Sequence, residues 1–189
     1  AARLADPKRE MPLQIYMAES KVTVEELCDN VNDQLTRDGR CIIVVSEGFE
    51  VGELGETKDS FGHTQFSASK TTVAQQLVTV LNEHGLPVPG KARGQVMGTD
   101  QRMTAIYASI PDLDEAYKVG QKAALIAESG ENGWMSTILR EPGPIYTVRY
   151  DKVPLEKVAN SERAFPKPWL APNKYAVTDA LVRYAQPLV

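Results

Sequence analysis

The feature that most constrains the fold is an unbroken apolar run, Cys41–Val45, that directly follows a helical pattern. The helix is predicted to begin at Thr23, because Thr23 and Glu26 have the spacing of a capping box, and to end at Gly39. A short segment that is apolar at every position is typical of a strand buried on both faces of a parallel sheet. A helix that leads into such a strand indicates an α/β fold.

The rest of the chain continues this alternation. Further strands are predicted over residues 13–18, 94–97, 133–139 and 145–150, and further helices near 70–84, from Asp112 with Glu115 three positions later, and near 176–185. The pattern predicts an α/β protein, a three-layer sandwich around a mostly parallel sheet. We expect residues 1–150 to form the main domain, in which residues 1–10 are the last turns of a helix whose beginning is missing. Residues 151–189 are expected to form a C-terminal extension with a terminal helix.

Charge and hydropathy exclude several classes of partner. The chain has 189 residues and a net charge of −4, so its surface as a whole will not attract nucleic acid or anionic membranes. No apolar run approaches the roughly 20 residues of a membrane-spanning helix, and nothing resembles a signal peptide. A cytoplasmic protein is therefore expected. Cys28 and Cys41 are predicted to be small core thiols rather than a disulfide or metal ligands.

Two polar stretches follow predicted strands and form the candidate site. Glu47 comes directly after the apolar run, and Arg93 and Arg102 flank a glycine turn at Gly98. Ligands of parallel sheets collect beyond the carboxyl ends of the strands. A guanidinium matches the oxygens of a phosphate, and a carboxylate can accept hydrogen bonds from sugar hydroxyls. The pattern predicts a sugar-phosphate pocket, whereas the plainer alternative is two solvated arginines and a loop carboxylate.

No residue of the chain is predicted to carry out catalysis or to bind a metal. His63 lies in a glycine-rich loop, residues 48–68, where a surface or structural role is the simpler interpretation. Thr104 and Ser109 have no base beside them in the sequence, and the glycine-rich nucleotide motifs are absent.

The order of the motifs adds a family resemblance. The matching segments are Gly39–Gly48, Asp59–His63, Arg93 followed by Gly98–Arg102, Ser109 with Asp112–Ala116, Val119–Gly120 and Tyr184–Val189. Read in this order, they resemble the carboxyl-terminal half of bacterial 6-phosphofructokinases, closest to the pyrophosphate-dependent branch. The resemblance covers nearly the whole chain.

The resemblance implies a set of substrate-binding residues: Glu47, Arg93, Thr99, Asp100, Gln101 and Arg102. Glu47 would hydrogen-bond the sugar of fructose 6-phosphate. Arg102 and Arg93 would hold the 6-phosphate, and in relatives the second of these reaches into the neighbouring subunit's site. Thr99 stands where relatives carry His or Tyr. A second departure is Ser67–Lys70, where relatives often have Leu-Gly-Gly.

The same resemblance implies a glycolytic phosphotransferase that needs a longer parent chain. The family's donor site, catalytic base and magnesium ligands precede the point where this chain begins, so the parent would supply Mg²⁺ binding and a donor, pyrophosphate or ATP. Its partners would be fructose 6-phosphate, its own N-terminal domain and further copies in a homo-oligomer, and the isolated chain is expected to be inactive. The alternatives are a stand-alone, non-catalytic sugar-phosphate-binding or regulatory module and an unrelated flavodoxin-like binding domain.

Overall fold

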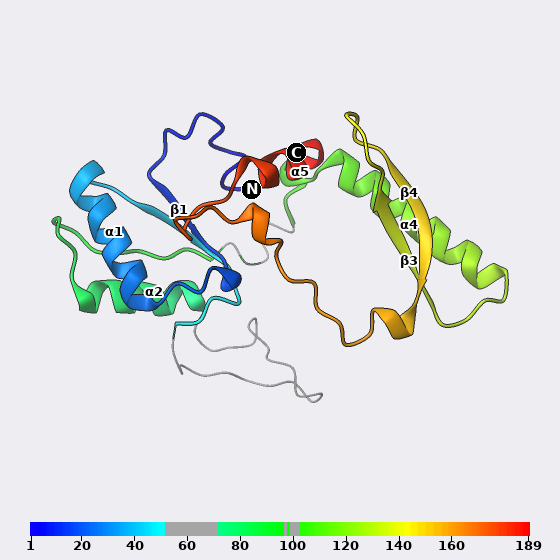
Figure 1. Cartoon of the computed structure of the whole chain (residues 1–189), viewed down its shortest axis with the longest axis horizontal. Helices are drawn as coiled ribbons and strands as arrows, with labels where there is room; N and C mark the ends of the chain where they lie inside the picture. The colour runs from blue at the N-terminus through cyan, green and yellow to red at the C-terminus, as the bar shows by residue number, and fades with distance from the viewer. Residues whose placement is uncertain (52–71, 97, 99–102) are drawn as a thin grey trace. The chain divides into compact units, whose positions relative to one another are not determined.

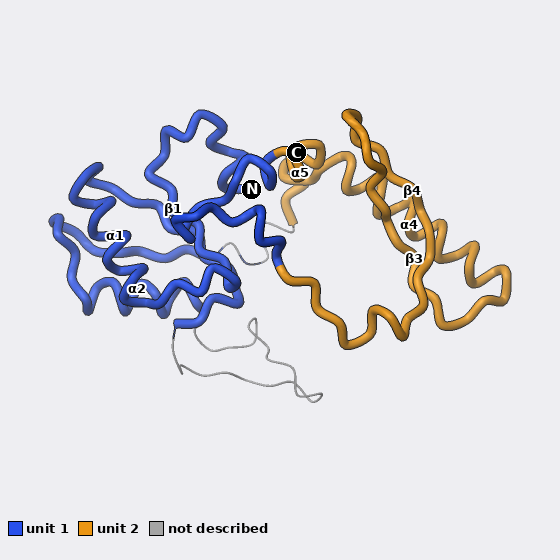
Figure 2. Tube along the Cα trace, in the orientation of Figure 1, with its two compact units in different colours: residues 1–98, 165–182 blue, residues 99–164, 183–189 orange. Residues whose placement is uncertain are grey.

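The computed structural model of the chain describes residues 1–51, 72–96, 98 and 103–189. Figure 2 shows two compact units: unit 1 joins Ala1–Gly98 to Phe165–Val182, and unit 2 joins Thr99–Ala164 to Arg183–Val189. These units are defined by compactness alone. The predicted division into a sugar-phosphate domain, residues 1–150, and an extension, residues 151–189, therefore stays a prediction.

Unit 1 is built on a parallel pair of strands. β1 (Leu13–Tyr16) pairs with β2 (Ile42–Val45) in a register that runs from Leu13 opposite Ile42 to Tyr16 opposite Val45. The crossover between them contains α1 (Val24–Asp38), as Figure 1 shows. The predicted strand–helix–strand order and the parallel pairing are confirmed for this segment.

Local sequence signals set the ends of α1. The Thr23 hydroxyl accepts a hydrogen bond from the Glu26 amide, and the Glu26 carboxylate accepts one from the Thr23 amide, both at 3.1 Å. This is the predicted capping box. Gly39 ends the helix with φ of 68°, a left-handed conformation that glycine adopts without steric cost.

The second helix of unit 1, α2 (Val73–His84), completes a one-sided core. Its buried residues Leu77 and Leu81 share a hydrophobic cluster with Leu27 and Val31 of α1. Alternate residues of β2 contact this cluster, whereas Ile42 and Val44 are 40% and 37% exposed. Among the described residues β2 is thus covered on one face only, and the expected burial on both faces is not observed.

A hydrogen-bonded tyrosine stands at the centre of this core. Tyr16 is fully buried, and its ring contacts Phe49 edge-on at a centroid distance of 5.8 Å. Its hydroxyl donates to the Gln14 side chain at 2.8 Å, and Gln14 in turn donates to the Asn30 carbonyl at 2.9 Å. The Ile15 amide donates to the Tyr175 carbonyl at 2.9 Å, so the late segment of unit 1 lies along β1.

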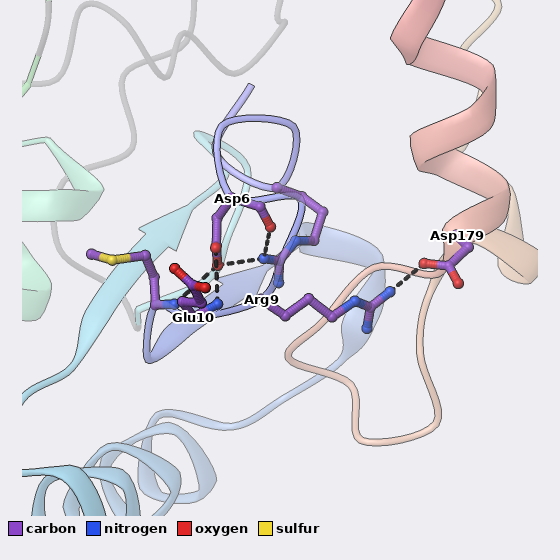
Figure 3. Close-up of polar contacts among 6 residues, drawn as sticks. Asp6, Arg9, Glu10 and Asp179 are labelled. Carbon is purple, nitrogen blue, oxygen red and sulfur yellow. Dashed lines mark hydrogen bonds and ion pairs between the residues drawn. The ribbon is translucent and has the colours of Figure 1, made fainter.

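The N-terminal segment forms turns rather than the expected helix end. One helix-type hydrogen bond joins the Ala5 amide to the Ala1 carbonyl, and no helix is present over residues 1–10. The buried Asp6 carboxylate instead organises this segment, because it accepts hydrogen bonds from the amides of Glu10 and Met11 at 2.9 and 3.1 Å (Figure 3). Arg9 forms an ion pair with Asp179, which ties the segment to the start of α5 (Asp179–Ala185).

Unit 2 pairs one long helix with an antiparallel ribbon. α4 (Ile110–Glu128) packs on β3 (Trp134–Arg140) and β4 (Val148–Pro154), and the strands run antiparallel from Trp134 opposite Pro154 to Arg140 opposite Val148. A parallel connection needs a dozen or more residues, so the short link between these strands allows only the antiparallel pairing. The strands at 133–150 therefore form a sheet separate from β1 and β2.

Two local expectations differ from the structure. Residues 94–96 of the predicted strand 94–97 have no regular secondary structure, and residue 97 lies outside the described residues. α4 begins before Asp112, because the Ser109 hydroxyl caps it by accepting from the Asp112 amide at 3.3 Å.

The described part of the chain also contains short 3-10 helices at Ala18–Ser20, Ala105–Tyr107, Leu155–Lys157, Lys167–Trp169 and Gln186–Leu188. Within that part, no helix combines the length and the apolar character needed to cross a membrane.

Candidate functional site

Glu47 lies where the sequence predicts it, in the turn that directly follows β2. The start of the turn is fixed at Ser46, whose amide donates to the Tyr16 carbonyl at 2.9 Å and whose hydroxyl accepts from the Ala18 amide at 3.1 Å. Phe49 is 4% exposed and anchors the far end of the turn in the core. The carboxylate itself is exposed, so it is presented to solvent from a rigid backbone at the carboxyl ends of both parallel strands.

Arg93 is held by the backbone on either side of it. The Ala92 amide donates to the Asn82 side chain of α2 at 2.9 Å, and the Asn82 amide group donates to the Ala92 carbonyl at 3.2 Å. On the other side Gly94 packs closely on α2: a Cβ there would lie 2.9 Å from Cγ2 of Val78 and 3.3 Å from the Ala74 carbonyl oxygen. Arg93 is exposed and makes no ion pair with another described residue.

The structure does not bring the whole predicted set together. Thr99, Asp100, Gln101 and Arg102 lie outside the described residues, as do His63 and most of the 48–68 loop. Glu47 and Arg93 both belong to unit 1, but no hydrogen bond or ion pair connects them in the described part of the chain. The sugar-phosphate pocket therefore stays a prediction.

A cavity of about 380 Å³ lies beside Arg93, between α1, β2, α2 and residues 91–95. Lys91 and Arg93 line it together with aliphatic side chains such as Val31 and Leu77, and Glu47 does not. Cys41 also lines it; burial raises the pKa of this thiol to about 11, so it is protonated and unreactive at neutral pH. Both cysteines are free, as expected, and Cys28 is fully buried.

The sequence reasoning missed one polar cluster in unit 2. Glu115 is only 9% exposed, and its carboxylate accepts a hydrogen bond from the Tyr146 hydroxyl at 2.7 Å. The sequence did not predict this hydrogen bond, because the three-residue spacing of Asp112 and Glu115 is typical of a helix cap and Glu115 was assigned to one. Tyr146 comes 31 positions later, in the link between β3 and β4, so only the folded ribbon brings the two side chains together.

The acidic, histidine and cysteine side chains of the described residues do not gather into a metal site. Nowhere in the described ranges do three His, Cys, Asp or Glu side chains come together as a metal site. Magnesium binding by oxygen ligands needs such convergence or a substrate phosphate. The described residues alone therefore do not fit Mg²⁺.

Two curated proteins that are similar in sequence to this chain carry the same name. No protein-family model matches the chain. A pyrophosphate–fructose 6-phosphate 1-phosphotransferase of Halomonas elongata is 33% identical over 165 residues, which are 84% of this chain and 38% of the relative. The enzyme of the same name from Rhodospirillum rubrum is 30% identical over 187 residues, which are 94% of this chain and 45% of the relative.

A solved structure agrees with these sequence relatives. The pyrophosphate-dependent phosphofructokinase from Nitrosospira multiformis matches with a TM-score of 0.73 and 27% identity, over 97% of this chain and 42% of that one. The match confirms the α/β fold class and the resemblance drawn from the ordered motifs. The chain spans less than half the length of the curated relatives that it matches.

Proposed function

Because this chain belongs to the phosphofructokinase family, we propose that it supplies the acceptor-binding part of an enzyme that phosphorylates fructose 6-phosphate. The observation that supports this most directly is the position of Glu47 on a fixed turn at the carboxyl ends of β1 and β2. A carboxylate held in this way is positioned to accept hydrogen bonds from the hydroxyls of a sugar without a further ordering cost.

Arg93 supplies the complementary charge. Its flanking residues are fixed on α2 through Asn82 and through the close approach of Gly94, while the guanidinium is exposed. A guanidinium in this position holds the 6-phosphate through paired hydrogen bonds. Arg102, with Thr99, Asp100 and Gln101, completes the phosphate contacts in this proposal.

The rest of the reaction belongs to other groups. Phosphoryl transfer depends on positioning and on electrostatic stabilisation of the moving phosphoryl group. In our proposal, pyrophosphate is the donor, and Mg²⁺ would be held by residues of the parent enzyme. The donor site and the catalytic base come from an N-terminal domain of the parent enzyme, which acts as a homo-oligomer. The chain by itself then binds acceptor and forms no product.

Calorimetry with fructose 6-phosphate tests the binding part of the proposal. We expect Glu47→Gln, Arg93→Gln and Arg102→Ala each to weaken binding by about 1.5–3 kcal/mol, because each removes a hydrogen bond that involves a charged group. Arg149→Gln is the matched control, since Arg149 is engaged by Glu141 at 2.8 Å and by Asp151 in unit 2. Equal affinity of the three site variants and the wild type would refute the proposed clamp.

A coupled assay for fructose 1,6-bisphosphate tests the second part. Purified chain is supplied with fructose 6-phosphate, Mg²⁺ and either pyrophosphate or ATP. We expect no product with either donor, although the sugar phosphate binds. Product formation would show that the chain contains a complete catalytic site, contrary to the proposal.

A further inference from the structure

Unit 2 contains a cavity that the proposed function does not use. It has a volume of about 430 Å³ and lies between α4, β3, β4 and the C-terminal residues. Its polar wall consists of Glu115, Arg140, Tyr146, Arg163 and Tyr184, and the remainder is aliphatic. Two guanidinium groups and one buried carboxylate thus face the same space.

The first guanidinium is held in place before any ligand arrives. The central carbon of the Arg140 guanidinium lies 4.9 Å from the ring centre of Tyr146 and 5.0 Å from that of Tyr184. One of its N–H groups donates to the Tyr184 carbonyl at 2.6 Å. Stacking and this hydrogen bond fix the side chain, while the other N–H groups of the guanidinium stay available. The ordering cost of using them as donors is correspondingly small.

Neither arginine of the cavity wall is engaged by a carboxylate of a described residue. Within the described ranges, neither Arg140 nor Arg163 forms an ion pair. Arg149, which belongs to the same ribbon, is neutralised by Glu141 and Asp151. The ribbon arginine without an ion pair, Arg140, is thus the one that lines the cavity, although the chain as a whole carries a net charge of −4.

Glu115 adds an acceptor to the same wall. One of its oxygens accepts from the Tyr146 hydroxyl, and burial, followed by this bond to Glu115, raises the pKa of Tyr146 to about 12. The hydroxyl therefore stays protonated and keeps donating to Glu115 at neutral pH. The other oxygen of Glu115 has no hydrogen-bond donor among the described residues.

We propose that this cavity binds a small phosphate ester that also carries a hydroxyl group. Arg140 and Arg163 hold the phosphate, and the Glu115 carboxylate accepts a hydrogen bond from the hydroxyl group. A phosphate is favoured over a carboxylate because it offers three acceptor oxygens, enough to accept from both guanidinium groups. This site is independent of Glu47 and Arg93, which belong to unit 1.

Titration of the 189-residue chain with glycerol 3-phosphate, followed by ³¹P NMR, tests the site, with acetate as the carboxylate probe. We expect saturable binding of the phosphate ester and weaker binding of acetate. Arg140→Gln and Arg163→Gln should each raise the Kd by about tenfold or more, because each removes a charged hydrogen-bond donor. Both side chains are exposed, so these variants are expected to keep the wild-type circular dichroism spectrum.

Two matched variants locate the binding. Arg149→Gln removes a neutralised arginine from the same ribbon and should leave the Kd within about twofold of wild type. Arg93→Gln removes the arginine of the proposed sugar-phosphate site in unit 1, so it separates binding there from binding in the unit 2 cavity. Three outcomes would overturn the proposal: no saturation at about 10 mM ester, equal affinity for acetate, or a loss of binding in Arg93→Gln but not in Arg140→Gln.

Discussion

The close packing of Gly94 on α2 leads to a prediction with a defined sign. Gly94→Ala would place a Cβ 2.9 Å from Cγ2 of Val78 and 3.3 Å from the Ala74 carbonyl oxygen, which is closer than van der Waals contact. Overpacking of this kind costs about 1–3 kcal/mol. Gly94 does not have a positive φ, so the loss of unfolded-state entropy works in the opposite direction by about 0.4–1 kcal/mol. The expected net effect is a loss of roughly 0–2.6 kcal/mol of unfolding free energy.

A double-mutant cycle with Val78→Ala isolates the clash. Removing the Val78 methyl groups leaves the Ala74 oxygen as the nearest atom, so Gly94→Ala should be nearly neutral in that background. We expect a coupling energy of at least about 0.5 kcal/mol between the two positions. Gly48→Ala is the matched control, because its Cβ would meet only the Ala18 side chain at 3.4 Å.

Urea unfolding of unit 1 can be followed by a single fluorophore. Trp169 belongs to unit 1 and stacks edge-on with Phe165, whereas Trp134 belongs to unit 2, so all variants are made in a Trp134→Phe background. If Gly94→Ala stabilises unit 1, or if it costs the same with and without Val78, the packing argument for this segment is wrong. A loss of unfolding free energy that occurs with Val78 present and disappears in the Val78→Ala variant would support the packing argument.

Two further predictions concern ionisation. Burial raises the pKa of Asp6, but the amides of Glu10 and Met11 and the Arg3 guanidinium outweigh it and lower that pKa below its ordinary value of 3.8. The ionised Asp6 carboxylate therefore stabilises the fold at pH values above 3.8, and this contribution is lost as the pH falls through the lower folded pKa. Asp6→Asn should therefore flatten the acid side of a plot of melting temperature against pH. An unchanged plot would contradict this explanation. The folded pKa of the Cys41 thiol is about 11. In a Cys28→Ser variant, which leaves Cys41 as the single thiol, iodoacetamide at about pH 8 should therefore alkylate the native protein more slowly than the urea-unfolded protein. Equal rates would show that the thiol is not buried.

Local signals in the sequence predicted the helices of unit 1 well. The capping box of Thr23 and Glu26 and the left-handed Gly39 involve only residues that are close in the sequence, so the ends of α1 follow from the sequence alone. The apolar run at β2 was also sufficient to predict a strand. Its burial on one face could not be predicted, because that depends on what the rest of the fold places against Ile42 and Val44.

Longer-range contacts account for what the sequence could not predict. Glu115 has the spacing of a cap residue, and its bond to Tyr146 depends on the pairing of β3 with β4. Gly94 was predicted to lie in a strand, but the tight contact with Val78 and the bonds to Asn82 hold that segment on α2 instead. The position of Glu47 was predicted correctly, because it follows directly from the end of the strand before it.

The hydrogen bond from the Ile15 amide to the Tyr175 carbonyl has a consequence for synthesis on the ribosome. The two residues are 160 positions apart (175 − 15), and Thr99–Ala164 of unit 2 is encoded between them. A nascent chain must therefore carry β1 without this partner until Tyr175 has emerged from the ribosome. A strand edge that lacks its partner can pair with other extended chains. The emerging protein is thus most exposed to aggregation when residues 99–164 of unit 2 have emerged and unit 1 still lacks Phe165–Val182.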